Sequence, residues 1–170
     1  MTPPTIRFAT AADDAPVGEL LVEAFREAYR RKMPEVVLPP ERLSDLRNTT
    51  QKRLNASVLV AETEGSIVGT VMILKPGAAG TEAWIPNAAD LRQLAVGREW
   101  QGLGVASALL DAAESLAWSW KAEAICVHTR RGAVGVAEVY RKRGYVRTPA
   151  GDFEGRAVTL EAHLKLRPNR

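Results

Sequence analysis

The sequence predicts an α+β fold, with a mixed sheet of about seven strands and helices on both faces of that sheet. Helical and strand periodicities alternate along the chain in the order β-α-α-β-β-β-α-β-α-β-β, which is typical of a sheet covered by helices. Two β-branched runs joined by a short Gly-containing turn indicate an antiparallel hairpin. A later strand–helix–strand unit indicates two neighbouring parallel strands.

The N-terminal part predicts one strand and two helices. The strand covers Thr5 to Ala9 and ends at a turn. Apolar residues then recur at helical spacing from Val17 to Ala28, with polar residues on the opposite face. If Asp13 is the N-cap, Pro16 falls in the first turn, where its missing N–H has no intrahelical acceptor to lose. Several prolines end this helix, and a weaker helical pattern covers residues 41–53.

The middle of the chain predicts three strands. Residues 58–60 and 67–73 are apolar or β-branched and are separated by Glu64-Gly65, so they form the expected hairpin. Residues 76–89 are rich in Pro, Gly and Ala and indicate a loop. Residues 91–96 form the next expected strand.

The C-terminal part completes the sheet. The expected elements are a helix over 104–120, a strand over 124–128, a helix over 134–142, and strands over 144–146 and 157–165. No internal repeat, low-complexity tract or linker divides the sequence. We therefore expect a single domain covering residues 1–170.

Composition excludes several classes of protein. The 170 residues are 46% hydrophobic and 25% charged, as in an ordinary soluble globular protein. Cys126 is the only cysteine, which excludes an intramolecular disulfide and a multi-cysteine zinc site and suits a reducing compartment. The N-terminus lacks the apolar core of a signal peptide, and the apolar run of residues 67–74 is far shorter than the roughly 20 residues of a membrane span. We expect a cytoplasmic protein with no metal and no membrane association.

The positive charge is concentrated in the second half. Residues 86–170 hold 13 basic and 9 acidic residues, whereas residues 1–85 hold 10 and 11. Within the second half, only Glu138 opposes a run of basic residues, namely Arg130, Arg131, Arg141, Lys142, Arg143 and Arg147. This run indicates either a solvated face or a site for an anionic partner. It lacks interleaved aromatic residues and any nucleic-acid-binding module, so we expect no nucleic-acid partner.

The strongest motif lies between Leu94 and Leu110, where a strand runs into a turn with Gly102 and Gly104 and then into an amphipathic helix. The first N–H groups of a helix have no partner and the helix dipole is positive there, so such a turn suits phosphate oxygens. A dinucleotide-binding G-x-G-x-x-G fits poorly, because Ser107 takes the third glycine position and a hairpin precedes the strand.

This segment resembles the acyl-CoA-binding core of the GCN5-related N-acetyltransferases, the GNAT family. Gln101-Gly-Leu-Gly-Val-Ala106 matches the family's Q/R-x-x-G-x-G/A signature, and Tyr140-Arg-Lys-Arg-Gly-Tyr145 resembles its Y-x-x-x-G-F/Y element. The order of elements matches over residues 5–165. The resemblance implies a GNAT-type mixed, mostly antiparallel central sheet and one N-acetyltransferase domain with acetyl-CoA as cosubstrate. The chain departs from the family at Ala133, where the family often has an Asn that contacts the cofactor.

The resemblance also implies roles for individual residues. The pyrophosphate of CoA would be held by the backbone N–H groups of Gln101, Gly102, Leu103, Gly104, Val105 and Ala106. The strand edge at Leu94, Ala95 and Val96 would pair with the pantetheine arm, and an N–H there would polarise the thioester carbonyl. Tyr140 would contact the cofactor and protonate the departing thiolate, because a phenol with a pKa of about 10 is protonated at neutral pH.

Direct attack by an amine also needs a proton acceptor. Asp90 at the mouth of the fourth strand and Glu82 in the preceding loop are candidates, and each is also consistent with an ordinary surface carboxylate. The acceptor of the acetyl group is expected to be a small-molecule or peptide amine, whose identity the sequence leaves open. The alternative function is a non-catalytic module on the same fold that senses acyl-CoA or binds a partner.

Several other residues invite a functional interpretation. Cys126 and His128 share one face of a strand, but two ligands do not make a zinc site, so a packed or hydrogen-bonded pair is expected. Trp84 either forms a wall of the acceptor site or anchors a loop. Trp118 and Trp120 cannot share one helical face, so we expect one in the core and the other at a rim or at the contact of a homodimer.

Overall fold

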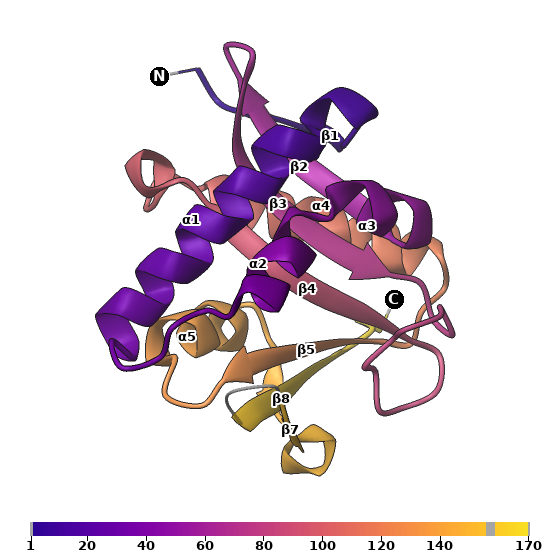
Figure 1. Cartoon of the computed structure of the whole chain (residues 1–170). Helices are drawn as coiled ribbons and strands as arrows, with labels where there is room; N and C mark the ends of the chain where they lie inside the picture. The colour runs from indigo at the N-terminus through magenta and orange to yellow at the C-terminus, as the bar shows by residue number, and fades with distance from the viewer. Residues whose placement is uncertain (1, 156–158, 170) are drawn as a thin grey trace. The chain divides into compact units, whose positions relative to one another are not determined.

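The structure is a computed structural model that describes residues 2–155 and 159–169 (Figure 1). It confirms the predicted fold class: a mixed, mostly antiparallel sheet with eight described strands, accompanied by five described α-helices. The strand order is β1-β2-β3-β4-β5-β8-β6, and β7 pairs with β8. The strands are β1 (Thr5–Phe8), β2 (Ser57–Thr63), β3 (Ser66–Leu74), β4 (Ala88–Val96), β5 (Ala124–Arg130), β6 (Val146–Arg147), β7 (Phe153–Glu154) and β8 (Thr159–Leu166). The helices are α1 (Asp14–Lys32), α2 (Pro40–Arg47), α3 (Thr49–Asn55), α4 (Val105–Ser119) and α5 (Val134–Lys142).

The chain divides into two compact units that interleave in sequence. The first unit comprises Met1–Met72 and Gln93–Ala113, and the second comprises Ile73–Arg92 and Glu114–Arg170. The candidate phosphate-binding turn belongs to the first unit, whereas Asp90 and Tyr140 belong to the second.

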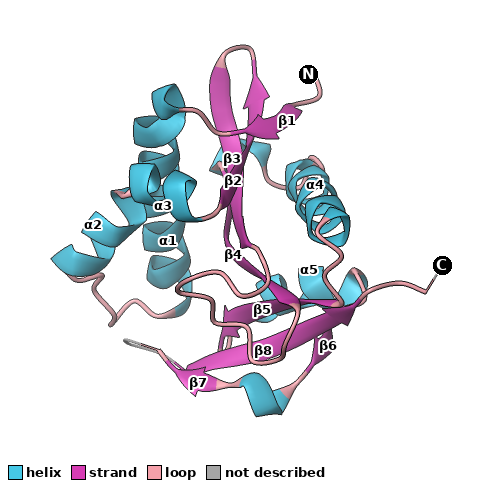
Figure 2. Cartoon of the chain, turned by 90° about the vertical axis from the view of Figure 1, so that its right-hand side faces the viewer, coloured by secondary structure: helices cyan, strands magenta, loops and turns pink. Residues whose placement is uncertain are grey.

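In the first unit, helices cover both faces of the strands, as the sequence predicts. Figure 2 shows α1, α2 and α3 on one side of β2 and β3, and α4 on the other. β1 pairs with β2 in antiparallel register. Glu64 and Gly65, which join β2 to β3, have φ angles of 50° and 77°, the geometry of the tight turn that suits a hairpin. This confirms the predicted hairpin.

A glycine lets α4 lie very close to β3. A Cβ built on Gly69 would lie 2.9 Å from Cδ1 of Leu109 and 3.0 Å from Cγ1 of Val105. Both of these helical side chains are almost completely buried. A larger residue at this position would have to displace these side chains, so glycine allows the close packing of α4 on β3.

The N-terminal helices differ in detail from the prediction. Asp13 directly precedes α1 and Pro16 is its third residue, as expected, but the Asp13 carboxylate does not cap α1. It accepts hydrogen bonds from Arg7 at 2.7 and 3.0 Å and from the Thr10 N–H at 2.7 Å. The single helix predicted over 41–53 is instead two, α2 and α3, because Asn48 between them has a non-helical ψ of 57°.

The second unit is built around β8. This strand pairs in antiparallel register with β5, β6 and β7, and β5 pairs in parallel with β4 over Ala88–Leu91. The two-residue strand β7 is absent from the prediction because it is too short to show a periodicity. The predicted start of the last strand at residue 157 lies outside the described residues, and β8 is described from Thr159. None of the described helices is long and apolar enough to cross a membrane.

Candidate functional site

Two glycines shape the turn between β4 and α4. Gly102 and Gly104 have φ angles of +76° and +86°, a left-handed conformation that other residues rarely adopt. A Cβ on either glycine would meet no atom within 4 Å, so the backbone conformation, and not lack of space, requires glycine here. Residues 101–104 are exposed, whereas Val105 at the start of α4 is buried.

This turn presents a row of backbone N–H groups without partners. Among the described hydrogen bonds, none is donated by the N–H of residues 102–107, and the first bond of α4 runs from Ala108 N–H to the Gly104 carbonyl at 3.0 Å. The positive end of the α4 dipole lies at the same place. Such an arrangement attracts an anion with several oxygen acceptors, of which a phosphate is the common example.

The end of β4 leads into the turn through an irregular residue. Gln93 has a φ of 55°, outside the β region, which is the local geometry of a bulge. The following residues Leu94 and Val96 are half-buried, and Ala95 between them is buried. The side-chain amide of Gln101 donates to the Val96 carbonyl at 3.2 Å and so ties the turn to the strand.

Tyr140 lies in the last part of α5 and is almost completely buried. Its side chain meets the ring of Tyr145 edge-on, with 5.2 Å between ring centroids, and no described residue forms a hydrogen bond with its hydroxyl. Burial raises the pKa of the phenol well above its ordinary value of about 10. The phenol of Tyr140 is therefore neutral at physiological pH. Ala133, the departure from the family pattern, is the buried residue before α5.

Asp90 is fully buried, so its interpretation as an ordinary surface carboxylate is wrong. Its Oδ2 accepts hydrogen bonds from the Glu82 N–H at 2.7 Å and from Arg92 Nε at 2.9 Å. Its Oδ1 is buried and has no hydrogen-bond partner. Glu82 differs, because its side chain is 40% exposed and its carboxylate lies 3.8 Å from Nη1 of Arg92.

His128 is packed between two aromatic rings. Trp84 and Phe153 both meet it edge-on, at centroid distances of 5.1 and 4.7 Å, and its Nε2 lies 2.8 Å from the Gly151 carbonyl oxygen. Because a carbonyl only accepts, Nε2 carries the proton in this contact. Trp84 thus anchors its loop in the second unit.

The expectation of a packed Cys126 and His128 is confirmed, since both side chains are buried. Burial raises the pKa of the Cys126 thiol to about 11, and this cysteine is not in a disulfide. No group of three or more His, Cys, Asp or Glu side chains within the described part of the chain could hold a metal ion. The sequence does not predict Phe153 and Gly151 as partners of His128, because both lie far from it along the chain and belong to no motif.

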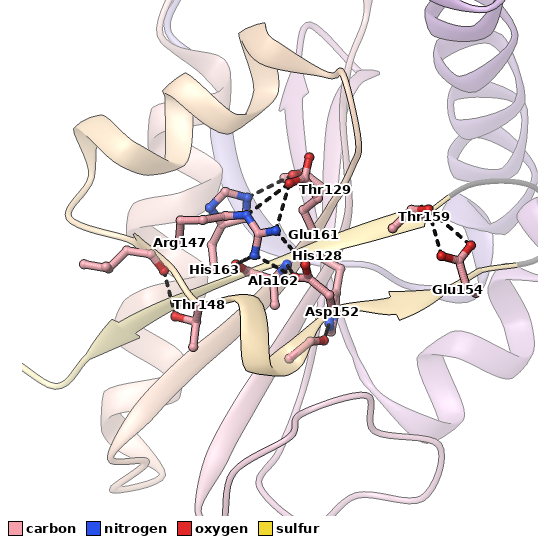
Figure 3. Close-up of polar contacts among 12 residues, drawn as sticks. His128, Thr129, Arg147, Thr148, Asp152, Glu154, Thr159, Glu161, Ala162 and His163 are labelled. Carbon is pink, nitrogen blue, oxygen red and sulfur yellow. Dashed lines mark hydrogen bonds and ion pairs between the residues drawn. The ribbon is translucent and has the colours of Figure 1, made fainter.

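Of the six residues in the basic run, three form described ion pairs with carboxylates, and two of these three find their partners outside the stretch in which only Glu138 is acidic. Arg141 pairs with Glu138, but Arg143 pairs with Glu114 on α4 at 3.0 Å. Figure 3 shows Arg147 between two acidic side chains, with Nη2 lying 2.6 Å from Asp152 and 2.8 Å from Glu161. Arg143 and Arg147 therefore join segments of the second unit, whereas the exposed Arg141–Glu138 pair lies within α5.

The tryptophan near the end of α4 and the one that directly follows the helix also correct an expectation. Trp118 and Trp120 are both half-buried, so neither is a core residue. The Lys75 ammonium lies over the Trp120 ring, 5.5 Å from its centroid, and so shields part of the indole from solvent.

Comparison with known proteins agrees with these features. The model of the acetyltransferase (GNAT) family matches residues 16–145. A GNAT-family acetyltransferase from Staphylococcus aureus superimposes with a TM-score of 0.75 at 14% identity, covering 96% of this chain and 98% of that chain. The protein described as histone acetyltransferase HPA2 and related acetyltransferase from Corynebacterium glutamicum gives 0.72 at 24% identity, covering 99% of both chains.

A third structure was solved with a ligand. It is a GNAT-family acetyltransferase from Elizabethkingia anophelis with acetyl-CoA bound, which gives a TM-score of 0.66 at 16% identity and covers 98% of this chain and 100% of that chain. Comparison with curated proteins found no match. At these identities the solved structures establish the fold, while the family model spans most of the sequence and includes both the glycine turn and Tyr140. The chain belongs to the GNAT family of acetyltransferases.

Proposed function

We propose that residues 1–170 form a single cytoplasmic N-acetyltransferase domain that transfers an acetyl group from acetyl-CoA to a primary amine. The observation that carries this proposal is the row of unpartnered N–H groups at residues 102–107, within the segment matched by the family model. These groups and the α4 dipole suit the two phosphates of the CoA pyrophosphate. The edge at Leu94, Ala95 and Val96 is proposed to pair with the amides of the pantetheine arm.

The proposed chemistry is direct attack through a tetrahedral intermediate. The amine nitrogen forms a bond to the thioester carbon, and the carbonyl oxygen becomes an oxyanion that a backbone N–H of Leu94 or Val96 stabilises. The carbon–sulfur bond then breaks, and the departing thiolate takes the phenolic proton of Tyr140. The raised pKa of Tyr140 means that its phenol is protonated at neutral pH, which is the form that this role requires.

We further propose that Asp90 receives the proton that the attacking amine loses. Its Oδ2 is already occupied by Arg92 and by the Glu82 N–H, so Oδ1 is the oxygen left for a proton. An amine with a pKa of about 10.4 must be deprotonated before or during attack, which makes such an acceptor necessary.

Binding and turnover test separate parts of the proposal. Isothermal titration is expected to show acetyl-CoA binding, and no binding at millimolar ligand would overturn the whole assignment. Tyr140→Phe is expected to lower kcat about a hundredfold while the affinity for acetyl-CoA changes little, since general acid catalysis contributes roughly that factor. Asp90→Asn should lower kcat most at low pH, where the amine is most protonated. An unchanged kcat would remove the altered residue from the mechanism.

The alternative is a non-catalytic module that senses acyl-CoA or binds a partner on the same fold. The observation that favours it is Ala133, which stands where the family often has a cofactor-contacting Asn. A CoA-release assay with a panel of amines distinguishes the two functions. The panel should include peptide N-termini, lysine, polyamines and small primary amines. Tight acetyl-CoA binding without release on any of them would support the module.

A further inference from the structure

One buried carboxylate binds three charged or polar side chains from two other segments of the second unit. Glu114 of α4 is 7% exposed and accepts hydrogen bonds from Arg143, which follows α5, and from Lys165 of β8. The Arg143 contact is bidentate, with Nε and Nη2 each 3.0 Å from a different carboxylate oxygen, and Lys165 Nζ lies at 2.9 Å. The hydroxyl of Tyr145 donates to the same carboxylate at 3.2 Å.

Tyr145 connects this ionic cluster to Tyr140. The two rings meet at an interplanar angle of 69°, and the Tyr145 N–H donates to the Tyr140 carbonyl at 3.1 Å. The Lys165 ammonium lies 5.6 Å from the centroid of the Tyr145 ring. Tyr145 is thus held by three contacts: its hydroxyl bonds Glu114, its ring faces Lys165, and its N–H bonds the Tyr140 carbonyl. The Tyr145 ring therefore packs as a fixed surface against one side of the Tyr140 ring.

We propose that Glu114 is a positioning residue for acetyl transfer, which holds the Tyr140 hydroxyl in place through Tyr145. This inference rests on the proposed function of Tyr140 as the proton donor to the thiolate. A proton donor must lie within about 3 Å of the atom that it protonates, so a small rotation of the Tyr140 ring lowers the rate. No motif marks Glu114, and its partners lie 29, 31 and 51 residues away along the chain.

The cluster also sets the charge around the Tyr140 phenol. The charged groups that face it are Glu114, which raises the pKa of Tyr140, and Arg143, which lowers it, and Lys165 is bound to the same carboxylate. Replacing Glu114 by Gln keeps the shape of the side chain but removes the negative charge that raises the pKa of Tyr140. The phenolate form of Tyr140 is then favoured, so the pKa of Tyr140 falls.

The test is a double-mutant cycle between Glu114→Gln and Tyr140→Phe, measured on the full chain with acetyl-CoA and the best amine of the panel. We expect Glu114→Gln to lower kcat about tenfold with less than about a twofold change in the KM for acetyl-CoA. The alkaline limb of its kcat–pH profile should begin at lower pH than in the wild-type protein. In the Tyr140→Phe background the same substitution should change kcat by less than about twofold, because the group that Glu114 positions is gone.

Each outcome of the cycle has a defined meaning. If Tyr140→Phe leaves kcat unchanged, the proposed function of Tyr140 fails and takes this inference with it. If Tyr140→Phe lowers kcat but Glu114→Gln acts equally in both backgrounds, or not at all, only the inference about Glu114 is overturned. Glu138→Gln removes an exposed ion pair with Arg141 and is the matched control, expected to leave kcat and its pH profile unchanged.

A second variant covers the case in which Glu114→Gln does not fold. Tyr145→Phe keeps the ring against Tyr140 and removes only the hydroxyl that reaches Glu114. We expect kcat to fall about threefold at an unchanged KM for acetyl-CoA, since one of the contacts that hold this ring is lost. A kcat equal to that of the wild-type protein would overturn the inference.

Discussion

Gly151 lies directly against the indole ring of Trp84, so that a Cβ built on Gly151 would be 2.3 Å from Cδ2 of that ring. The Gly151 carbonyl also accepts the hydrogen bond from Nε2 of His128 at 2.8 Å, and the His128 ring meets Trp84 edge-on. Three segments distant in sequence are thus fixed to one another within the second unit. The contact requires glycine because no other residue can bring its backbone this close to an aromatic ring.

Gly151→Ala is expected to destabilise the protein by about 3 kcal/mol, because the methyl group must displace a packed indole ring. Gly97→Ala is the matched control, since its Cβ would meet its nearest atom at 3.5 Å, an ordinary contact, and its φ of −54° suits alanine. Urea unfolding measures both variants. Equal stability losses would contradict the close packing of Gly151 on Trp84.

Asp13 should make the stability of the protein pH-dependent in the acid range. Hydrogen bonds from Arg7 lower the pKa of Asp13 from 3.8 to about 2. A carboxylate with a lowered pKa stabilises the folded state above its unfolded pKa and loses this contribution as pH falls toward its folded pKa. The difference in unfolding free energy between wild type and Asp13→Asn should therefore be largest above about pH 4 and shrink toward pH 2. A difference that does not change with pH would contradict the Arg7–Asp13 interaction.

Cys126 should resist thiol reagents in the folded protein. Its side chain is completely buried, and burial raises the pKa of its thiol to about 11. At pH 8 only about one thiol in a thousand is then ionised, and that one is shielded from solvent. We expect the reaction with Ellman's reagent to be slow in the native protein and fast in urea. Rapid labelling of the native protein would show that β5 is open to solvent at this position.

The features that can be predicted from the sequence are those that depend on a few neighbouring residues. The glycine turn at residues 102–104 and the tight turn at Glu64-Gly65 need backbone conformations that only certain residues adopt, so both can be read from the residues alone. Tyr140 is found through a short motif. These local signals were sufficient to predict the family and most of the elements.

The features that the sequence hides depend on partners far away along the chain. Arg143 finds Glu114 at a distance of 29 residues, and Arg147 finds Glu161 at a distance of 14. A count of charges within one stretch therefore misses the carboxylates that other segments bring to Arg143 and Arg147. The break at Asn48 also escaped prediction, because one non-helical ψ angle leaves no trace in the apolar periodicity.

The glycine turn offers a test that separates backbone strain from ligand binding. Gly104 and Gly65 have similar φ angles of +86° and +77°, and a Cβ at either position would meet no atom within 4 Å. Both Gly→Ala substitutions should therefore cost about 1–2 kcal/mol of stability from left-handed backbone strain alone. Only Gly104 lies among the unpartnered N–H groups of residues 102–107, whereas Gly65 lies in the hairpin turn.

We therefore expect Gly104→Ala to weaken acetyl-CoA binding about tenfold, because relief of the strain reorients N–H groups that would otherwise face the pyrophosphate. Gly65→Ala should leave the affinity within about twofold of the wild-type value, since its strain acts in the β2–β3 turn and not in the turn that carries these N–H groups. Isothermal titration gives both affinities, and urea unfolding confirms that the two variants are equally destabilised. If both variants bind acetyl-CoA as tightly as the wild-type protein does, the pyrophosphate is not held by this turn.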